Sequence, residues 1–178
     1  MVQPNRLARS LAKLERVPAF LRPWARNQVM GRAVPFTGTA GLDFAHMAPE
    51  RVEIAVANAR RVQNHIQGVH AAAMALLAET ATGMVVGMNV RDDCLPLAKE
   101  LRVAFKRRAQ GALRAVATLT DEQRALMQQS DKGEVTVAVQ VSDESGAQPI
   151  ECEFIWAGVP ASKSKTSAPA APAATPQR

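Results

Sequence analysis

Hydrophobic residues in the first 32 positions recur at the spacing of a helix. Leu7, Leu11 and Leu14 lie four and three residues apart in RLARSLAKLERV, which predicts an amphipathic helix ending at Pro18. A second short helix is expected in FLRPWARNQVM. Seven of these 32 residues are basic and one is acidic. Such a segment either docks on its own domain or lies on an anionic membrane surface.

From residue 38 onward the hydrophobic period changes to two. Val52, Ile54 and Val56 alternate with smaller or polar residues and predict a half-buried strand, and the preceding GTAGLDFAH is its expected hairpin partner. The turn residues MAPE join the two. Four further alternating runs predict strands at 101–105, 113–117, 135–141 and 150–156. Between them, DEQRALMQQ favours a short helix or turn, and SDESGAQP favours a hairpin connection.

One stretch, residues 71–88, is almost wholly apolar, and its only charged residue is Glu79. It is built from alanine, glycine and threonine, and a central acid disfavours membrane insertion, so we expect a buried helix at about 69–88 and no transmembrane segment. One long helix among about six strands excludes a doubly wound parallel sheet. The pattern predicts an α+β fold in which a single antiparallel sheet wraps around that helix.

Charge is distributed unevenly along the chain. The net charge is +6, but residues 33–158 alone carry −3, so the basicity belongs to the two ends. Aromatic residues make up only 4% and tyrosine is absent, so we expect no nucleic-acid partner. Cys94 and Cys152 match no metal-ligand spacing, and we expect reduced thiols and no metal or cofactor. The N-terminus lacks the apolar core of a secretory signal, which favours a cytoplasmic protein.

These patterns divide the chain into three expected parts. Residues 1–32 form a basic helical extension, residues 33–158 form the sheet-and-helix domain, and residues 159–178 form a disordered tail rich in proline, alanine and serine.

Three residues around the start of the long helix carry a resemblance to a known family. Asn64 is followed six residues later by His70 and nine residues after that by Glu79, in NHIQGVHAAAMALLAE. This spacing resembles hotdog-fold thioesterases of the phenylacetyl-CoA type, and the overall pattern is closest to an uncharacterised bacterial branch. The run LAKELRVAFKRRAQGALRAVATL resembles the paired strands of the same family. The resemblance covers about residues 38–157 and implies the hotdog fold, with an active site at a dimer interface.

The chain departs from the family pattern at two points. The family has Gly-Gly after the histidine where this chain has Ala71 and Ala72, and its usual aspartate is Glu79 here. Alanine keeps the backbone N–H but adds a methyl group, which restricts the approach of a carbonyl group.

Helical geometry adds a constraint on this candidate site. Nine residues correspond to about 900° of rotation and roughly 13 Å of rise, so His70 and Glu79 cannot easily meet within one subunit. A shared site therefore needs His70 from one chain and Glu79 from another. We expect Glu79 to share its helix face with mostly small residues: Ala72, Ala75, Leu76, Thr82 and Gly83. Apolar surroundings should raise the pKa of Glu79, which suits a general base.

The resemblance and the chemistry together suggest a role for each candidate residue. Glu79 would activate water or attack directly, while His70 and Asn64 would position the reacting groups. The backbone N–H groups of Ala71 and Ala72 would bind an oxyanion. The basic residues proposed to hold coenzyme A phosphates are Arg102, Lys106, Arg107 and Arg108. Each candidate also has a structural interpretation. Glu79 could be a hydrogen-bonded structural acid, His70 a helix cap and Asn64 a turn residue, and the four basic residues could form a solvated strand face.

The leading hypothesis is an acyl-CoA thioesterase that hydrolyses the thioester of acyl-CoA or of an acyl carrier and works as a homodimer or a dimer of dimers. Two alternatives remain open. One is a hydratase or dehydratase acting on acyl-carrier substrates, and the other is a non-catalytic protein that binds an acyl group or acyl-CoA.

Overall fold

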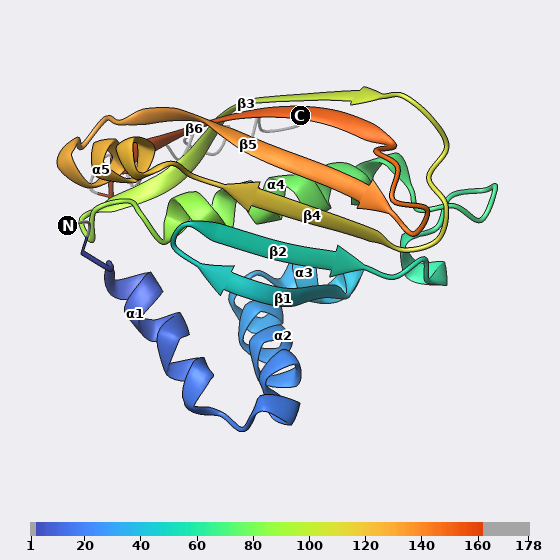
Figure 1. The fold of residues 1–178 in the computed structure, drawn as a ribbon, viewed down its shortest axis with the longest axis horizontal. Helices are drawn as coiled ribbons and strands as arrows, with labels where there is room; N and C mark the ends of the chain where they lie inside the picture. Colours follow the sequence, from blue (N-terminus) through green and yellow to red (C-terminus); the bar gives the residue numbers. More distant parts are fainter. Residues whose placement is uncertain (1–2, 162–178) are drawn as a thin grey trace, which may run out of the picture.

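The structure, a computed structural model, describes residues 3–161 and is organised around one long helix, α4 (Ala71–Gly87). A six-stranded antiparallel sheet wraps around α4 and contacts it from every strand (Figure 1). The strands are β1 (Leu42–Ala48), β2 (Arg51–Val56), β3 (Cys94–Phe105), β4 (Leu113–Thr118), β5 (Glu134–Asp143) and β6 (Ile150–Pro160). Their order is β1-β2-β4-β5-β6-β3. This is the hotdog fold, as the family resemblance predicted.

The sheet curves because β5 changes its partner midway. Its first residues, from Glu134 to Val137, pair with β6, whereas the residues from Ala138 to Asp143 pair with β4. A strand that crosses from one neighbour to another bends the sheet around the helix that it covers. The hydrophobic side chains pointing inward from both halves then enclose α4 in a single core.

The predicted strands and helices are present, with two differences. Residues 38–40 belong to a short helix, α3 (Pro35–Ala40), instead of the β1 strand. Pro35 favours the first turn of this helix, and Gly41, with a φ of 68°, ends it in the left-handed conformation. Strand β3 begins at Cys94, well before the predicted start at residue 101. The prediction missed its first half because a register shift between Ala98 and Glu100 interrupts the alternation of hydrophobic residues.

Two helices precede the domain, and the second of them docks on its β1 edge (Figure 1). They are α1 (Arg6–Ala12) and α2 (Arg22–Ala33), joined by short 3-10 turns. Arg26 is buried, donates to the Ala45 carbonyl at 2.5 Å and pairs with Glu15. At the other end of the extension, the Asn5 side-chain amide donates to the carbonyls of Gly87 and Val90, at 2.8 and 2.7 Å. Asn5 therefore satisfies carbonyl groups at the C-terminal end of α4.

The remaining boundaries are close to those expected. The predicted short helix is α5 (Asp121–Gln129), which begins with a capping box between Thr120 and Gln123. Strand β6 continues to Pro160, so the first two residues of the expected tail belong to the sheet. The rest of that tail, from residue 162, lies outside the described residues. Within residues 3–161, no helix is long and apolar enough to cross a membrane.

A buried hydrogen bond links α4 to β6. The indole N–H of Trp156 donates to Thr82 Oγ1 at 3.0 Å, and both side chains are buried. Beside them, a Cβ placed on Gly83 would lie only 2.7 Å from the Trp156 ring. The absence of a side chain at position 83 therefore allows the indole ring to pack directly on the helix.

Replacing Thr82 by valine keeps the side-chain shape but removes the acceptor of the Trp156 N–H. We expect Thr82→Val to lower the free energy of unfolding by about 1–3 kcal/mol, because the indole N–H is left buried and unpaired. Urea unfolding followed by circular dichroism measures this. The matched control is Thr136→Val, at an exposed position of β5, where the change should stay within about 0.5 kcal/mol. Equal effects at both positions would contradict the assigned role of the hydrogen bond.

Candidate active site

Asn64 is the turn-forming residue of the loop that precedes α4. Its side-chain oxygen accepts hydrogen bonds from the backbone N–H groups of Ile66 and Gly68, each at 3.1 Å. Its own N–H donates to the Gly68 carbonyl at 2.9 Å. The amide nitrogen of the side chain makes no hydrogen bond within residues 3–161. Asn64 therefore shapes the loop with its oxygen and leaves two donor hydrogens available.

His70 is the N-cap residue of α4. Its extended backbone, with φ −65° and ψ 143°, precedes the first helical turn, and its Nδ1 accepts from the Ala72 N–H at 3.0 Å. An accepting Nδ1 places the proton of the neutral ring on Nε2. Since the His70 side chain is exposed, this Nε2–H is available to a ligand.

The hydrogen bond between His70 and Ala72 makes the two expected oxyanion donors differ in availability. The Ala72 N–H is already bonded to the His70 ring, whereas the Ala71 N–H has no partner among the residues that the structure describes. Ala71 is exposed at the N-terminal end of α4, where the helix dipole favours negative charge. Of the two predicted donors, only Ala71 is free to bind an oxyanion in this arrangement.

A cavity of about 230 Å³ opens beside His70, between α3, the loop and the first turns of α4. Its lining is largely apolar: Phe36, Thr39, Ala40, Arg61, Val62, Gln63, His70, Ala72, Ala73 and Leu76. The sequence did not single out Phe36 or Arg61, because the segment around Phe36 carries no periodicity that would indicate a helix folded over the site. The Arg61 guanidinium donates to the Ala40 carbonyl at 3.2 Å, which joins two walls of the cavity.

Glu79 lies on a strip of α4 that its own sheet leaves partly open. Ala75, Leu76 and Gly83 are partly exposed like Glu79, as expected, whereas Thr82 is fully buried and accepts the hydrogen bond from Trp156. The carboxylate accepts one long hydrogen bond, from Thr80 Oγ1 at 3.4 Å. Burial raises the pKa of Glu79, and the Thr80 hydroxyl opposes this only in part.

The absence of a cation distinguishes Glu79 from other shielded acids in the protein. Glu53 is buried but pairs with Arg51, at 2.5 Å, and with Arg114. Asp143 is buried and has Arg107 at 3.7 Å. Glu79 forms no ion pair with any described residue, and no hydrogen bond joins it to His70 or Asn64. A partly buried carboxylate without a cation is costly for a fold unless another group completes it.

The four basic residues expected to bind phosphate differ in their availability. Arg102 pairs with Glu100 at 2.6 Å and with Glu153 at 3.5 Å. Lys106 pairs with Glu151 at 2.7 Å, and Arg107 lies beside Asp143. Arg108 instead donates to the backbone carbonyl of Ile66 at 2.9 Å and has no carboxylate partner in the described part of the chain. This contact brings Arg108 to the loop that contains Asn64.

Neither cysteine is arranged for chemistry at this site. Cys94 is buried at the start of β3, and burial raises the pKa of the Cys152 thiol to about 11. Among residues 3–161 there is no group of histidine, cysteine and acidic side chains that could hold a metal ion.

Comparison with known proteins identifies relatives of the fold. A family model described as a domain of unknown function (DUF4442) matches residues 22–157. A solved protein of unknown function from Pseudomonas aeruginosa, described as a probable thioesterase, is 25% identical with a TM-score of 0.68, over 75% of this chain and 93% of that one. A putative thioesterase from Shewanella oneidensis is 13% identical with a TM-score of 0.65, over 75% and 94%. No protein with a curated description matches the chain.

A third solved structure, a mutant of a thioesterase from Staphylococcus aureus, is 16% identical with a TM-score of 0.61, over 71% of this chain and all of that one. The similarity covers nearly the full length of each of these proteins. The shared part is therefore a complete fold and not a fragment of one.

The raised pKa of Glu79 has a consequence for stability. Between the ordinary glutamate pKa and the raised one, the folded protein keeps a proton that the unfolded chain has lost, so stability falls as pH rises. Glu79→Gln cannot show this fall. We expect the variant to match the parent below the ordinary glutamate pKa and to be more stable at neutral pH, as measured by urea unfolding across a pH series. If Glu79→Gln were instead less stable at neutral pH, Glu79 would be paired with a cation in solution.

Proposed function

The chain belongs to the DUF4442 family, and on this premise we propose that it is an acyl-thioester hydrolase whose active site is completed by a second copy of the chain. The observation that carries the proposal is Glu79, a partly buried carboxylate of raised pKa that has no cation partner among residues 3–161, on a face of α4 lined mostly by small residues. The structural similarity to proteins described as thioesterases supports the same chemistry.

The proposed reaction uses Glu79 as a general base. The carboxylate takes a proton from a water molecule, whose oxygen attacks the thioester carbonyl carbon. The carbonyl oxygen becomes an oxyanion, which the Ala71 N–H stabilises at the start of α4. When the tetrahedral intermediate collapses, the carbon–sulfur bond breaks and the thiolate takes the proton from the Glu79 carboxyl. The products are a carboxylic acid and a free thiol, and Glu79 is restored.

Two subunits are needed because Glu79 lies more than two helical turns from Ala71 along α4. One chain provides Glu79, and the other provides the loop with Asn64, the His70 Nε2–H and the Ala71 N–H. The apolar cavity beside His70 offers room for part of an acyl group. Ala75 and Leu76 extend that apolar surface toward Glu79.

Arg108 is the best-supported residue for holding the phosphates of a coenzyme A substrate. It is the only one of the four predicted basic residues without a carboxylate partner in residues 3–161, and it lies against the loop that contains Asn64. Arg102, Lys106 and Arg107 would have to give up an ion pair to bind phosphate.

The free edge of β3 is the proposed contact between the two subunits. This twelve-residue strand is at the end of the sheet and exposes Leu95, Leu97, Leu101 and Phe105. A long edge strand with unpaired backbone groups and apolar side chains favours pairing with another strand. An antiparallel pair of β3 strands would join two sheets into one continuous layer.

Replacing the proposed base tests the mechanism directly. We expect Glu79→Gln to reduce thiol release from acyl-CoA by at least about 100-fold, because the amide cannot take the proton from water. The measurement is release of free thiol across a panel of acyl-CoA substrates, with the molar mass of the variant confirmed unchanged. Unchanged turnover in Glu79→Gln would exclude this mechanism.

Because His70 also caps α4, its test needs a substitution that keeps the cap. Asparagine is a good N-cap residue, so His70→Asn should preserve stability and still lower turnover if the imidazole positions the substrate. His65→Asn, on the same loop at an exposed position, is the matched control and should leave turnover unchanged. Thermal stabilisation by acyl-CoA without thiol release would favour the non-catalytic alternative, and formation of a 2-enoyl product would favour a dehydratase.

The subunit contact gives a separate prediction. Leu97→Arg combined with Leu101→Arg should convert the dimer to a monomer, because two buried charges without partners would oppose pairing of the β3 strands. Light scattering after size-exclusion chromatography measures the molar mass. Leu126→Arg, an equally exposed leucine on α5, should leave the dimer intact. A dimer that survives the double substitution would place the interface elsewhere.

A further inference from the structure

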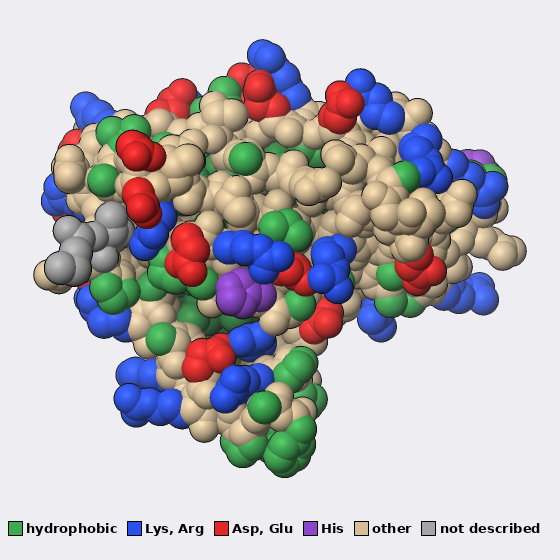
Figure 2. All heavy atoms as spheres, in the orientation of Figure 1, with side chains coloured by type: hydrophobic (Ala, Val, Ile, Leu, Met, Phe, Trp, Pro, Cys, Tyr) green, Lys and Arg blue, Asp and Glu red, His purple; other side chains and the backbone are tan. Residues whose placement is uncertain are grey.

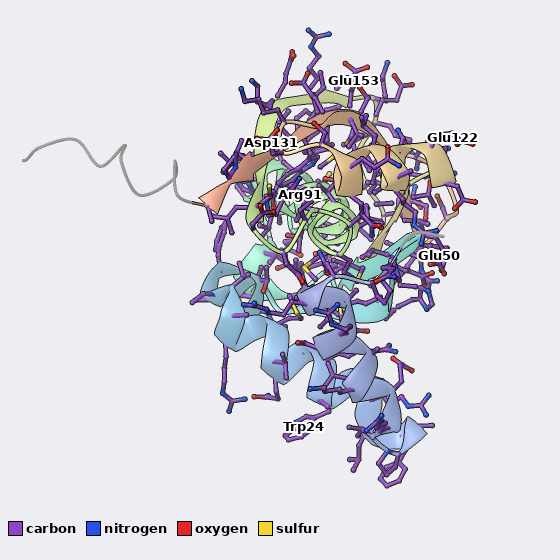
Figure 3. The ribbon with its side chains drawn as sticks, turned by 90° about the vertical axis from the view of Figure 1, so that its left-hand side faces the viewer. Trp24, Glu50, Arg91, Glu122, Asp131 and Glu153 are labelled. Atoms are coloured by element: carbon purple, nitrogen blue, oxygen red, sulfur yellow. The ribbon has the colours of Figure 1, made fainter. Side chains whose placement is uncertain are left out.

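The N-terminal helices end in a protruding tip, formed by residues 13–24 at the junction between α1 and α2. Figure 1 shows these helices extending from the β1 side of the sheet, and Figure 3 shows Trp24 pointing away from the body of the protein. The tip is linked to β1 through the buried Arg26, which donates to the Ala45 carbonyl and pairs with Glu15. Its position is therefore fixed by the fold.

The tip exposes large apolar side chains that contribute nothing to the core. Phe20 is 82% exposed and Trp24 is 64% exposed, and Leu21 beside them is also exposed. Figure 2 shows hydrophobic side chains gathered at this end of the molecule, with basic side chains flanking them. Aromatic residues at such exposure, clustered on one protrusion, indicate an interaction surface.

The charges around the tip are almost entirely positive. Lys13 and Arg16 are exposed and form no ion pair with any residue between 3 and 161. The only acid of the extension, Glu15, is occupied by Arg22 at 3.4 Å and by Arg26. The segment 1–32 thus carries +6, whereas residues 33–158 carry −3. A partner of this surface must accept aromatic side chains and supply negative charge.

We propose that the tip docks on the surface of an anionic lipid membrane. Phe20 and Trp24 enter the boundary between head groups and acyl chains, and Lys13 and Arg16 lie against anionic head groups. Trp and Phe favour this boundary, and basic residues strengthen the attachment. The surface is separate from the proposed dimer contact at β3. Helix α2 contacts β1, which lies at the opposite edge of the sheet from β3.

Intrinsic fluorescence provides a direct test with the full chain. The protein has two tryptophans, of which Trp156 is buried and Trp24 is exposed, so a change in emission on binding reports Trp24. Vesicles of phosphatidylcholine containing about a third phosphatidylglycerol should shift the emission to shorter wavelength, and vesicles of phosphatidylcholine alone should do so much less. Added salt should weaken the effect.

Vesicle sedimentation measures the contribution of each part of the tip. Phe20→Ser should weaken binding by roughly tenfold, the change expected for withdrawing one large apolar side chain. Lys13→Glu combined with Arg16→Glu should weaken it by about tenfold or more on anionic vesicles. The matched controls are Leu126→Ser, at an exposed position of α5, and Lys132→Glu, at an exposed position just after α5. Both should bind as the parent does.

Two outcomes would overturn the proposal. Equal affinity for the tip variants and the parent would show that another surface binds the vesicles or that none does. Loss of a larger assembly in Phe20→Ser, without any binding of the parent to vesicles, would show that a second copy of the chain covers the tip. Neither measurement uses a substrate, so failure here leaves the proposed hydrolase activity untouched.

Discussion

Burial of the apolar helix α4 is the constraint on which the rest of the structure depends. A helix that is apolar around nearly its whole circumference cannot rest on a flat sheet, because only one side would be covered. The exchange of partners along β5 bends the sheet far enough for all six strands to reach the helix. The sheet is curved because the helix that it covers is apolar on nearly all sides.

The order of strands and helices could be predicted from the sequence because periodicity changes sharply between the extension, the strands and the long helix. The prediction was wrong where a local conformation overrode the pattern: Pro35 and Gly41 place α3 where a strand was expected, and the irregularity near Ala98 concealed half of β3. The candidate site was predicted in part. Spacing selected Asn64, His70 and Glu79 as candidates, and their roles stay predictions; a hydrogen bond such as that between the His70 ring and the Ala72 N–H depends on a rotamer that no spacing specifies.

The position of Glu79 links stability to the proposed chemistry. Glu53 and Asp143 are shielded acids with arginine partners, and they act as structural elements of the sheet. Glu79 has no such partner within residues 3–161, and the same burial that disfavours its charge raises its affinity for a proton. A carboxylate that destabilises the fold and has a pKa suited to proton transfer is typical of functional sites, where activity often comes with lower stability.

The contact of Asn5 with the end of α4 has a consequence for where the folding unit begins. The family match starts at residue 22, yet the carbonyls of Gly87 and Val90 receive their hydrogen bonds from a residue far upstream of that point. A chain shortened to the family boundary would leave these carbonyls without their partner and would also lose Glu15, the partner of Arg26. The contacts that stabilise the domain therefore begin at least at Asn5, upstream of the residues that define the sequence family.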